Sequence, residues 1–168
     1  MRQLLFLILI LCTSLGFSQM YNPVKWKTQV EKISDSEYNL ISIATIEEGS
    51  HLYAQNIQEG GPIPTEFTYH NDNNDYTLIG NTSEEEGITV NDAVFEMEIK
   101  YFENTAVFKQ KVKLSKTADQ ITGSVLFMAC DDEKCTPPTD FELVFFLNES
   151  TKAASENPNE QIKSLNCL

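Results

Sequence analysis

Alternation between apolar and charged side chains is the feature that most constrains how this chain can fold. Over residues 94–102 the alternate positions form an apolar set (Phe95, Met97, Ile99 and Tyr101) and a charged set (Glu96, Glu98 and Lys100). A period of two puts the sets on opposite faces of a half-buried strand. Three lysines alternate with apolar residues in the same way over 106–114. The short break at 103–105 predicts that the two segments form a hairpin.

Further segments rich in β-branched and aromatic residues predict more strands. They are Val24–Ile33, Tyr38–Ile46, Thr65–His70, Tyr76–Ile79, Ile121–Ala129 and Phe141–Leu147. Many short strands without helical spacing predict an all-β, immunoglobulin-like antiparallel β-sandwich over residues 20–148. The segment 57–64, with three glycine and proline residues at 60–62, predicts a loop. The acidic run 84–87 predicts a solvated turn.

The two ends of the chain predict export and a tail. Residues 1–19 combine Arg2, an apolar run and small residues, as a signal peptide does, and the alternative is an uncleaved anchor. Cys12 lies in this run and is expected to leave with it. Residues 149–168 are polar and predict a flexible tail. The expected location is the periplasm, without stable insertion in the membrane.

The net charge of −13 argues against some partners. Nucleic acids and anionic membranes favour clustered lysine and arginine, so neither is an expected partner. The acidic surface is otherwise compatible with any soluble domain.

Three cysteines remain after removal of the signal peptide. Cys130 and Cys135 flank four polar residues between two strand candidates, and Pro137 and Pro138 follow. Outside the cytoplasm such a pair tends to be oxidised, and its polar loop must lie at the surface. We therefore expect a disulfide at an accessible hairpin tip. Cys167 remains free or pairs between chains in a dimer.

The cysteine pair allows three interpretations. A structural disulfide is the first, although so short a ring stabilises by only about 2 kcal/mol in the loop-closure model. A reversible redox couple is the second, because an exposed short bridge is accessible to exchange. The third is a zinc site, which would need His51 and His70 to converge on the cysteines. The carboxylates at 131–133 disfavour a thiolate, so the reduced pair should react slowly with chance disulfides.

Three sequence segments resemble a known family. The run from Cys130 to Pro138, ending Cys-Thr-Pro-Pro, is similar to the cysteine hairpin of the N-terminal periplasmic domain of DsbD, the thiol:disulfide interchange protein. Residues 48–53, Glu-Gly-Ser-His-Leu-Tyr, resemble the family's Gly-x-x-Leu-Tyr segment, and residues 91–96 fall where the family has its cap loop. Together the resemblance spans about 24–147.

The resemblance implies a role for each of these residues. It implies an immunoglobulin-like domain that receives electrons from a membrane electron transporter and passes them to thioredoxin-like periplasmic proteins, in processes such as cytochrome c biogenesis. Cys135 would form the mixed disulfide and Cys130 would resolve it. Phe95 would be the cap aromatic, while Tyr53 and His51 would line the site. Phe95 and Tyr53 also fit a simple core role. No metal or organic cofactor is implied.

The chain also differs from full-length members of that family. Those continue into a multi-helix membrane domain and a thioredoxin domain, whereas this chain ends at Leu168. We therefore expect either that a separate protein supplies its electrons or that the chain has lost this role. The loop between the cysteines is one residue shorter than in the best-known members. Two other functions stay open: a non-catalytic binding or adaptor module with a structural disulfide, and a surface protein that dimerises through Cys167.

Overall fold

The computed structural model describes residues 22–92 and 95–148, and all its regular elements in these ranges are strands. Their bounds are β1 Val24–Lys32, β2 Glu37–Ile46, β3 His51–Tyr53, β4 Glu66–His70, β5 Tyr76–Glu84, β6 Ile88–Asp92, β7 Met97–Phe102, β8 Thr105–Leu114, β9 Gln120–Phe127, β10 Ala129–Cys130 and β11 Thr139–Phe146. The predicted signal peptide, the tail, Cys12 and Cys167 lie outside the described residues.

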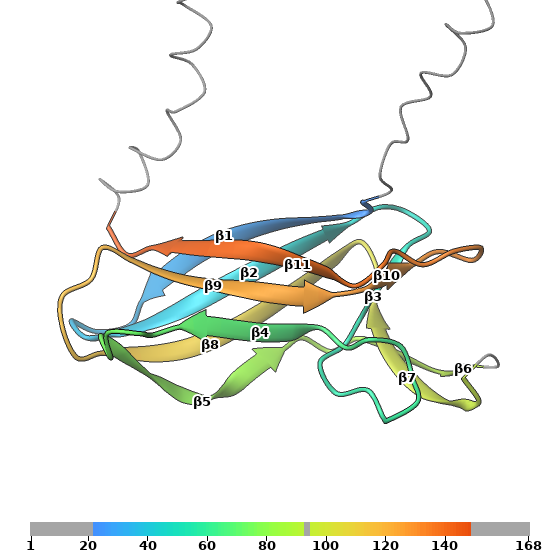
Figure 1. Cartoon of the computed structure of the whole chain (residues 1–168), viewed down its shortest axis with the longest axis horizontal. Coiled ribbons are helices and arrows are strands. Elements are labelled where there is room, and N and C mark those ends of the chain that lie inside the picture. The colour runs from blue at the N-terminus through green and yellow to red at the C-terminus, as the bar shows by residue number, and fades with distance from the viewer. Residues whose placement is uncertain (1–21, 93–94, 149–168) are drawn as a thin grey trace, which may run out of the picture.

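The strands form three antiparallel sheets (Figure 1). Two of them face each other as a sandwich, with strand orders β1-β2-β8-β5 and β11-β9-β4. The third, β10-β3-β7-β6, lies at one end of the sandwich, on the right of Figure 1. The all-β, immunoglobulin-like prediction is therefore confirmed.

Aromatic side chains fill the space between the two main sheets. The ring of Trp26 on β1 lies 5.9 Å from Phe67, 5.9 Å from Phe108 and 5.5 Å from Phe127, measured between centroids. These four residues come from β1, β4, β8 and β9, so the indole connects both sheets. Burial of such large apolar groups provides the main driving force for the sandwich.

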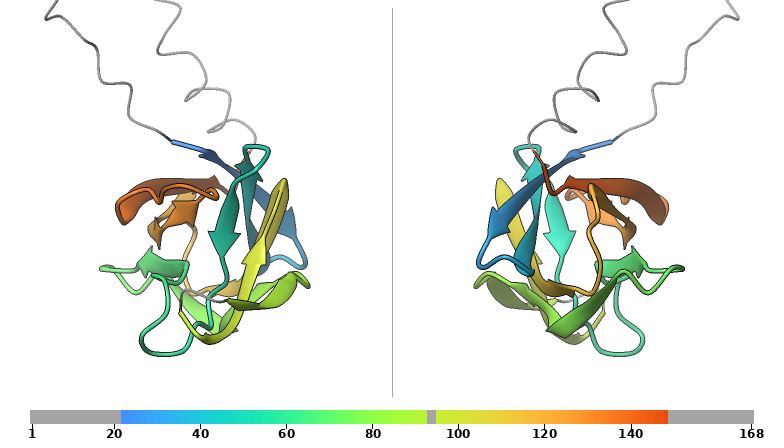
Figure 2. Two further views of the ribbon diagram at one scale, coloured as in Figure 1. Left: turned by 90° about the vertical axis from the view of Figure 1, so that its right-hand side faces the viewer. Right: turned by 90° about the vertical axis from the view of Figure 1, so that its left-hand side faces the viewer.

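The third sheet separates two apolar clusters. Leu52 on β3 and Phe102 on β7 are opposite each other and belong to the main core. Their neighbours Tyr53 and Tyr101 are also opposite each other but belong to a second, smaller cluster, which includes Cys130. Figure 2 shows in its left view how the short strands of this sheet close one end of the sandwich. This end carries the cysteine pair.

The predicted hairpin over 94–114 is wrong. Strand β7 pairs with β3 and β6, whereas β8 pairs with β2 and β5, so the two consecutive strands belong to different sheets. Glu103 and Asn104 turn the chain from one sheet to the other, and Asn104 has the positive φ of 60° that a tight turn requires. Alternation identified both strands but not their partners.

The acidic run 84–87 is only partly the solvated turn that was predicted. Strand β5 continues to Glu84, whose side chain is 11% exposed and whose carboxylate lies 2.9 Å from the ammonium of Lys100. The backbone N–H of Gln55 donates to this carboxylate at 2.9 Å, and its side-chain Nε2 donates to it at 3.2 Å. Glu84 therefore joins β5, β7 and the loop that follows β3. Strands β3 and β6 were not predicted; β3 has only three residues, too few for a clear period.

Candidate functional site: the disulfide at the end of the sandwich

A tight turn carries the two cysteines. Asp131 N–H donates to the carbonyl oxygen of Lys134 at 2.9 Å, and the Asp131 carboxylate accepts from the N–H groups of Glu133 and Lys134 at 2.9 and 2.8 Å. A side chain that binds backbone groups two and three residues on is a common way to stabilise a short turn. The turn places Cys130 and Cys135 opposite each other as an isolated β-bridge.

Thr136 stabilises the base of this turn. Its N–H donates to the carbonyl oxygen of Ala129 at 2.8 Å, and its hydroxyl accepts from Ala129 N–H at 3.1 Å. The Thr136 side chain is buried. Pro137 and Pro138 then follow as exposed residues without N–H donors, so pairing of β11 with β9 begins only at Thr139.

Cys130 and Cys135 form a disulfide with a Cα–Cα distance of 4.0 Å. Their exposure differs sharply. Cys130 is 3% exposed, whereas Cys135 is exposed at the surface. The bridge therefore joins a buried sulfur to a residue that an incoming reactant can reach.

Apolar and aromatic side chains surround Cys130. It forms the second cluster with Tyr53 and Ile99, and half-buried side chains pack against the three: Ile57, Phe95, Met97, Tyr101 and Met128. The loop that was predicted at 57–64 passes close to this cluster. A Cβ atom at Gly61 would lie 2.6 Å from Ile57 Cγ2 and 3.0 Å from the Met97 sulfur, so a larger residue here would force these cluster side chains to shift.

The structure brings the predicted site residues together. His51 on β3 is opposite Cys130 on β10 in the antiparallel register, and its ring lies 4.7 Å from that of Tyr101. Tyr53 and Phe95 both belong to the Cys130 cluster. The fold thus makes neighbours of four residues that lie far apart in sequence: His51, Tyr53, Phe95 and Cys130.

Phe95 lies outside the regular strand in which alternation had placed it. Strand β7 begins only at Met97, because the preceding residue, Glu96, has a φ of 53° and so is not extended. Phe95 N–H donates to the Asp92 carboxylate at 3.0 Å. The phenyl ring therefore reaches the cluster from the turn between β6 and β7. Burial, with smaller contributions from Asp92 and Tyr101, raises the pKa of Tyr53.

The arrangement can carry out one kind of chemistry directly. A disulfide with one accessible sulfur can be opened by an external thiolate and closed again by its own second thiol. A model of the N-terminal part of the thiol:disulfide interchange protein DsbD matches residues 23–145. The chain belongs to the DsbD N-terminal family. Membership of this family, together with the bonded pair, supports thiol–disulfide exchange.

Two solved structures resemble this member of the DsbD N-terminal family. The reduced DsbD N-terminal domain of Neisseria meningitidis has a TM-score of 0.51 and 16% identity, over 75% of this chain and 86% of that one. The N-terminal periplasmic domain of ScsB from Proteus mirabilis has a TM-score of 0.51 and 17% identity, over 79% of this chain and 51% of that one. At such identities the likeness shows the fold. No curated protein sequence matches the chain significantly.

Some residues of the site were missed in the sequence. Ile57, Met128 and Thr136 touch the cluster or support the turn, but each is a single apolar or hydroxyl residue in an irregular stretch. Tyr101 had a signal, because it shares the apolar face of 94–102. The zinc interpretation requires His70 near the cysteines, yet His70 ends β4 at the other end of the sandwich (Figure 1). The described residues contain no group of three metal-ligating side chains.

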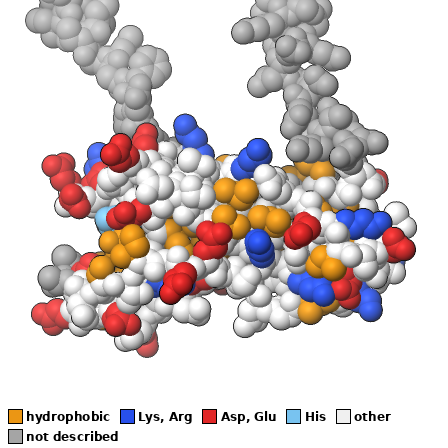
Figure 3. Space-filling view, turned by 180° about the vertical axis from the view of Figure 1, so that it is seen from behind, with side chains coloured by type: hydrophobic (Ala, Val, Ile, Leu, Met, Phe, Trp, Pro, Cys, Tyr) orange, Lys and Arg blue, Asp and Glu red, His pale blue; other side chains and the backbone are white. Residues whose placement is uncertain are grey.

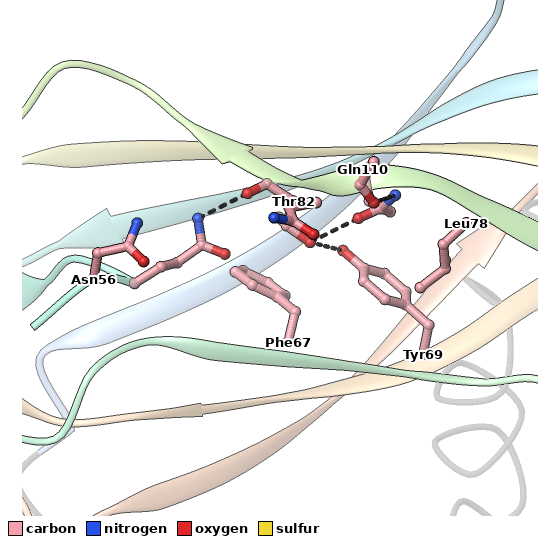
Figure 4. Close-up of a pocket in the computed structure, with 9 residues that line it drawn as sticks. Asn56, Phe67, Tyr69, Leu78, Thr82 and Gln110 are labelled. Atoms are coloured by element: carbon pink, nitrogen blue, oxygen red, sulfur yellow. Dashed lines mark hydrogen bonds between the residues drawn. The ribbon is translucent and has the colours of Figure 1, made fainter.

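A cavity of about 330 Å³ lies apart from the disulfide, between β4 and β5 (Figure 4). Its lining includes the rings of Phe67 and Tyr69 and the amides of Gln55 and Gln110. Thr82 connects them: its hydroxyl donates to Gln110 Oε1 at 2.9 Å, and its carbonyl oxygen accepts from Gln55 Nε2 at 3.1 Å. These bonds satisfy buried amides where β5 bulges away from β8, and so they stabilise that edge. No cysteine or ionisable group other than Tyr69 lines the cavity.

Helices long and apolar enough to span a bilayer are absent from residues 22–92 and 95–148.

Proposed function

We propose that this protein is a periplasmic thiol–disulfide exchange domain that passes electrons through Cys130 and Cys135 to thioredoxin-like partners. The observation that carries the proposal is the unequal exposure of the two bonded cysteines in a member of the DsbD N-terminal family. A membrane electron transporter is the proposed source of the electrons.

In the proposed reaction Cys135 acts first. Its thiolate attacks a sulfur of the partner's disulfide; a Cys135–partner disulfide forms, the partner's own bond breaks, and the departing sulfur takes a proton. The Cys130 thiolate then attacks Cys135 Sγ and releases the partner's second thiol. Two electrons and two protons reach the partner, and the Cys130–Cys135 disulfide is formed again.

We assign three supporting residues to this reaction. Phe95, which packs against the Cys130 cluster from a turn, covers the bridge until a partner docks. Tyr53 and His51 line the site and orient the two strands that meet at Cys130. These side chains exclude water from Cys130 while Cys135 stays accessible.

Single cysteine variants test the proposal. Cys130→Ala leaves the exposed thiol and should trap a mixed disulfide with an oxidised thioredoxin, visible as a reducible adduct on a non-reducing gel. Cys135→Ala leaves the buried thiol and should trap much less. If the wild-type bridge resists reduced thioredoxin and neither variant forms an adduct, the disulfide is only a structural link, as an adaptor module would require.

A further inference from the structure

Charge is distributed unequally between the two ends of the sandwich. At the end of the sandwich that carries the disulfide, several separate segments expose carboxylates: Glu47, Glu48, Glu85, Glu86, Glu96, Glu98, Glu103, Asp132 and Glu133. We call these nine residues the acidic rim. Three lysines lie close to the rim: Lys25, Lys100 and Lys134. Lys25 is near Glu47, whose N–H donates to the Pro23 carbonyl oxygen, and Lys100 is paired with Glu84.

The opposite end of the molecule has a more balanced charge. Lys32, Lys111 and Lys116 lie there, and each forms an ion pair with a carboxylate. Figure 3 shows the molecule from behind, so that the disulfide end is on the left. Acidic side chains gather at that end around a hydrophobic patch, whereas most lysines lie toward the other end.

The hydrophobic part of this end is an extension of the Cys130 cluster. On the sheet β10-β3-β7-β6, Ile88 is opposite Tyr101 and Val90 is opposite Ile99, so these four side chains share the face that carries Cys130. Ile88 and Val90 are 43% and 36% exposed on the edge strand β6. The face therefore runs from the disulfide to an uncovered apolar edge inside the acidic rim.

From this arrangement we infer the surface chemistry of the redox partner, an inference that rests on the proposed function. The partner presents an apolar centre at its reactive cysteine, bordered by lysines and arginines. Sulfur exchange requires its cysteine to contact Cys135, which lies two and three residues after the exposed carboxylates of Glu133 and Asp132. Charges brought this close are only partly screened, because the Debye length is about 8 Å at physiological salt. An acidic partner would meet repulsion there, whereas a basic one is steered into contact.

Two thioredoxin probes of opposite charge test the inference. A bacterial thioredoxin is altered around its active-site cysteine, with lysines in one probe and glutamates in the other. Oxidation of the reduced full chain by each oxidised probe is followed by quenched flow at ionic strengths from about 20 mM to about 500 mM. The lysine probe should react at least about ten times faster at low salt, and the difference should shrink to less than about twofold at high salt.

Charge-reversal variants identify the surface responsible. Glu48→Lys with Glu96→Lys, from two segments of the rim that adjoin His51 and Phe95, should slow the lysine probe about tenfold at low salt. Glu31→Lys with Asp72→Lys, which changes the net charge equally at the opposite end, should alter the rate less than about twofold. Tyrosine fluorescence and circular dichroism confirm that both variants are folded.

The possible failures are distinguishable. Equal rates for the two probes at every salt concentration, or a faster glutamate probe, overturn the inference and leave the proposed function intact. Equal slowing by both variant pairs also overturns it, because net charge and not the rim would then control encounter. If neither probe exchanges while dithiothreitol reduces the bridge, the proposed function fails and the inference fails with it.

Discussion

Cys130 and Cys135 are bonded to each other, yet Cys130 belongs to a buried cluster and Cys135 lies at the surface. The difference arises because Cys130 ends a strand that pairs with β3, whereas Cys135 begins the return from the turn. One sulfur is thus supported by the fold while the other faces solvent.

This asymmetry predicts unequal thiol reactivity in the reduced protein. The Cys130→Ala variant keeps the exposed thiol of Cys135, and the Cys135→Ala variant keeps the buried thiol of Cys130. The exposed thiol should react with iodoacetamide at least about ten times faster than the buried one, because limited access slows the buried thiol. Mass spectrometry of timed samples gives both rates. The rates should converge in urea, where burial is lost. Similar rates in the folded variants would contradict the assigned order of attack.

Removal of the Phe95 ring should expose the bridge. Phe95→Ala is expected to speed reduction by dithiothreitol about three- to tenfold, because access to the sulfurs controls the rate. Phe141→Ala is the matched control, since Phe141 is exposed on β11 and outside the Cys130 cluster. A Phe95 variant that loses stability but keeps the wild-type reduction rate would show that the ring only packs the core.

The buried hydroxyl of Thr136 should stabilise the turn that carries the cysteines. Thr136→Val leaves Ala129 N–H without the acceptor at 3.1 Å, and an unsatisfied buried donor costs about 1–3 kcal/mol. Thr139→Val removes a hydroxyl that donates to Pro137 in an exposed position, so it should cost less than about 0.5 kcal/mol. Urea unfolding of the oxidised proteins measures both. Equal losses would argue against a special role for Thr136.

Tyr69 should make the fold sensitive to alkaline pH. Burial raises the pKa of Tyr69 to about 12, although its hydrogen bond with Thr82 opposes the shift. Above about pH 10 the unfolded chain loses this proton while the folded chain keeps it, so stability should fall by about 1.4 kcal/mol per pH unit until the folded pKa is reached. Below pH 10 this contribution is fully present.

Comparison with Tyr69→Phe isolates the effect, because phenylalanine has no proton to lose. The advantage of wild type over the variant in urea unfolding should shrink between about pH 9 and about pH 11. Tyr53 and Tyr76, whose pKa values are also raised, are common to both proteins and cancel. Parallel curves would mean that Tyr69 ionises in the folded protein as easily as in the unfolded chain.

Local pattern determined the class of the fold and the place of the bridge. Alternation and β-branched or aromatic composition require only neighbouring residues. Alternation predicted the strand at 106–114, and composition predicted those at 24–33 and 38–46, all close to their observed bounds. Two cysteines separated by a polar loop and followed by two prolines are typical of a short surface turn. The position of the disulfide was therefore predictable from its own segment.

Tertiary structure decided the partners of each strand and the surroundings of the bridge. Alternation divides a strand into two faces but does not say which strand lies beside it, so the separation of β7 from β8 became visible only with the sheets assembled. The approach of His51, Tyr53 and Phe95 to Cys130 depends on contacts between residues far apart in sequence. The same contacts bury Cys130 and leave Cys135 exposed, because only the complete cluster can exclude water from one sulfur.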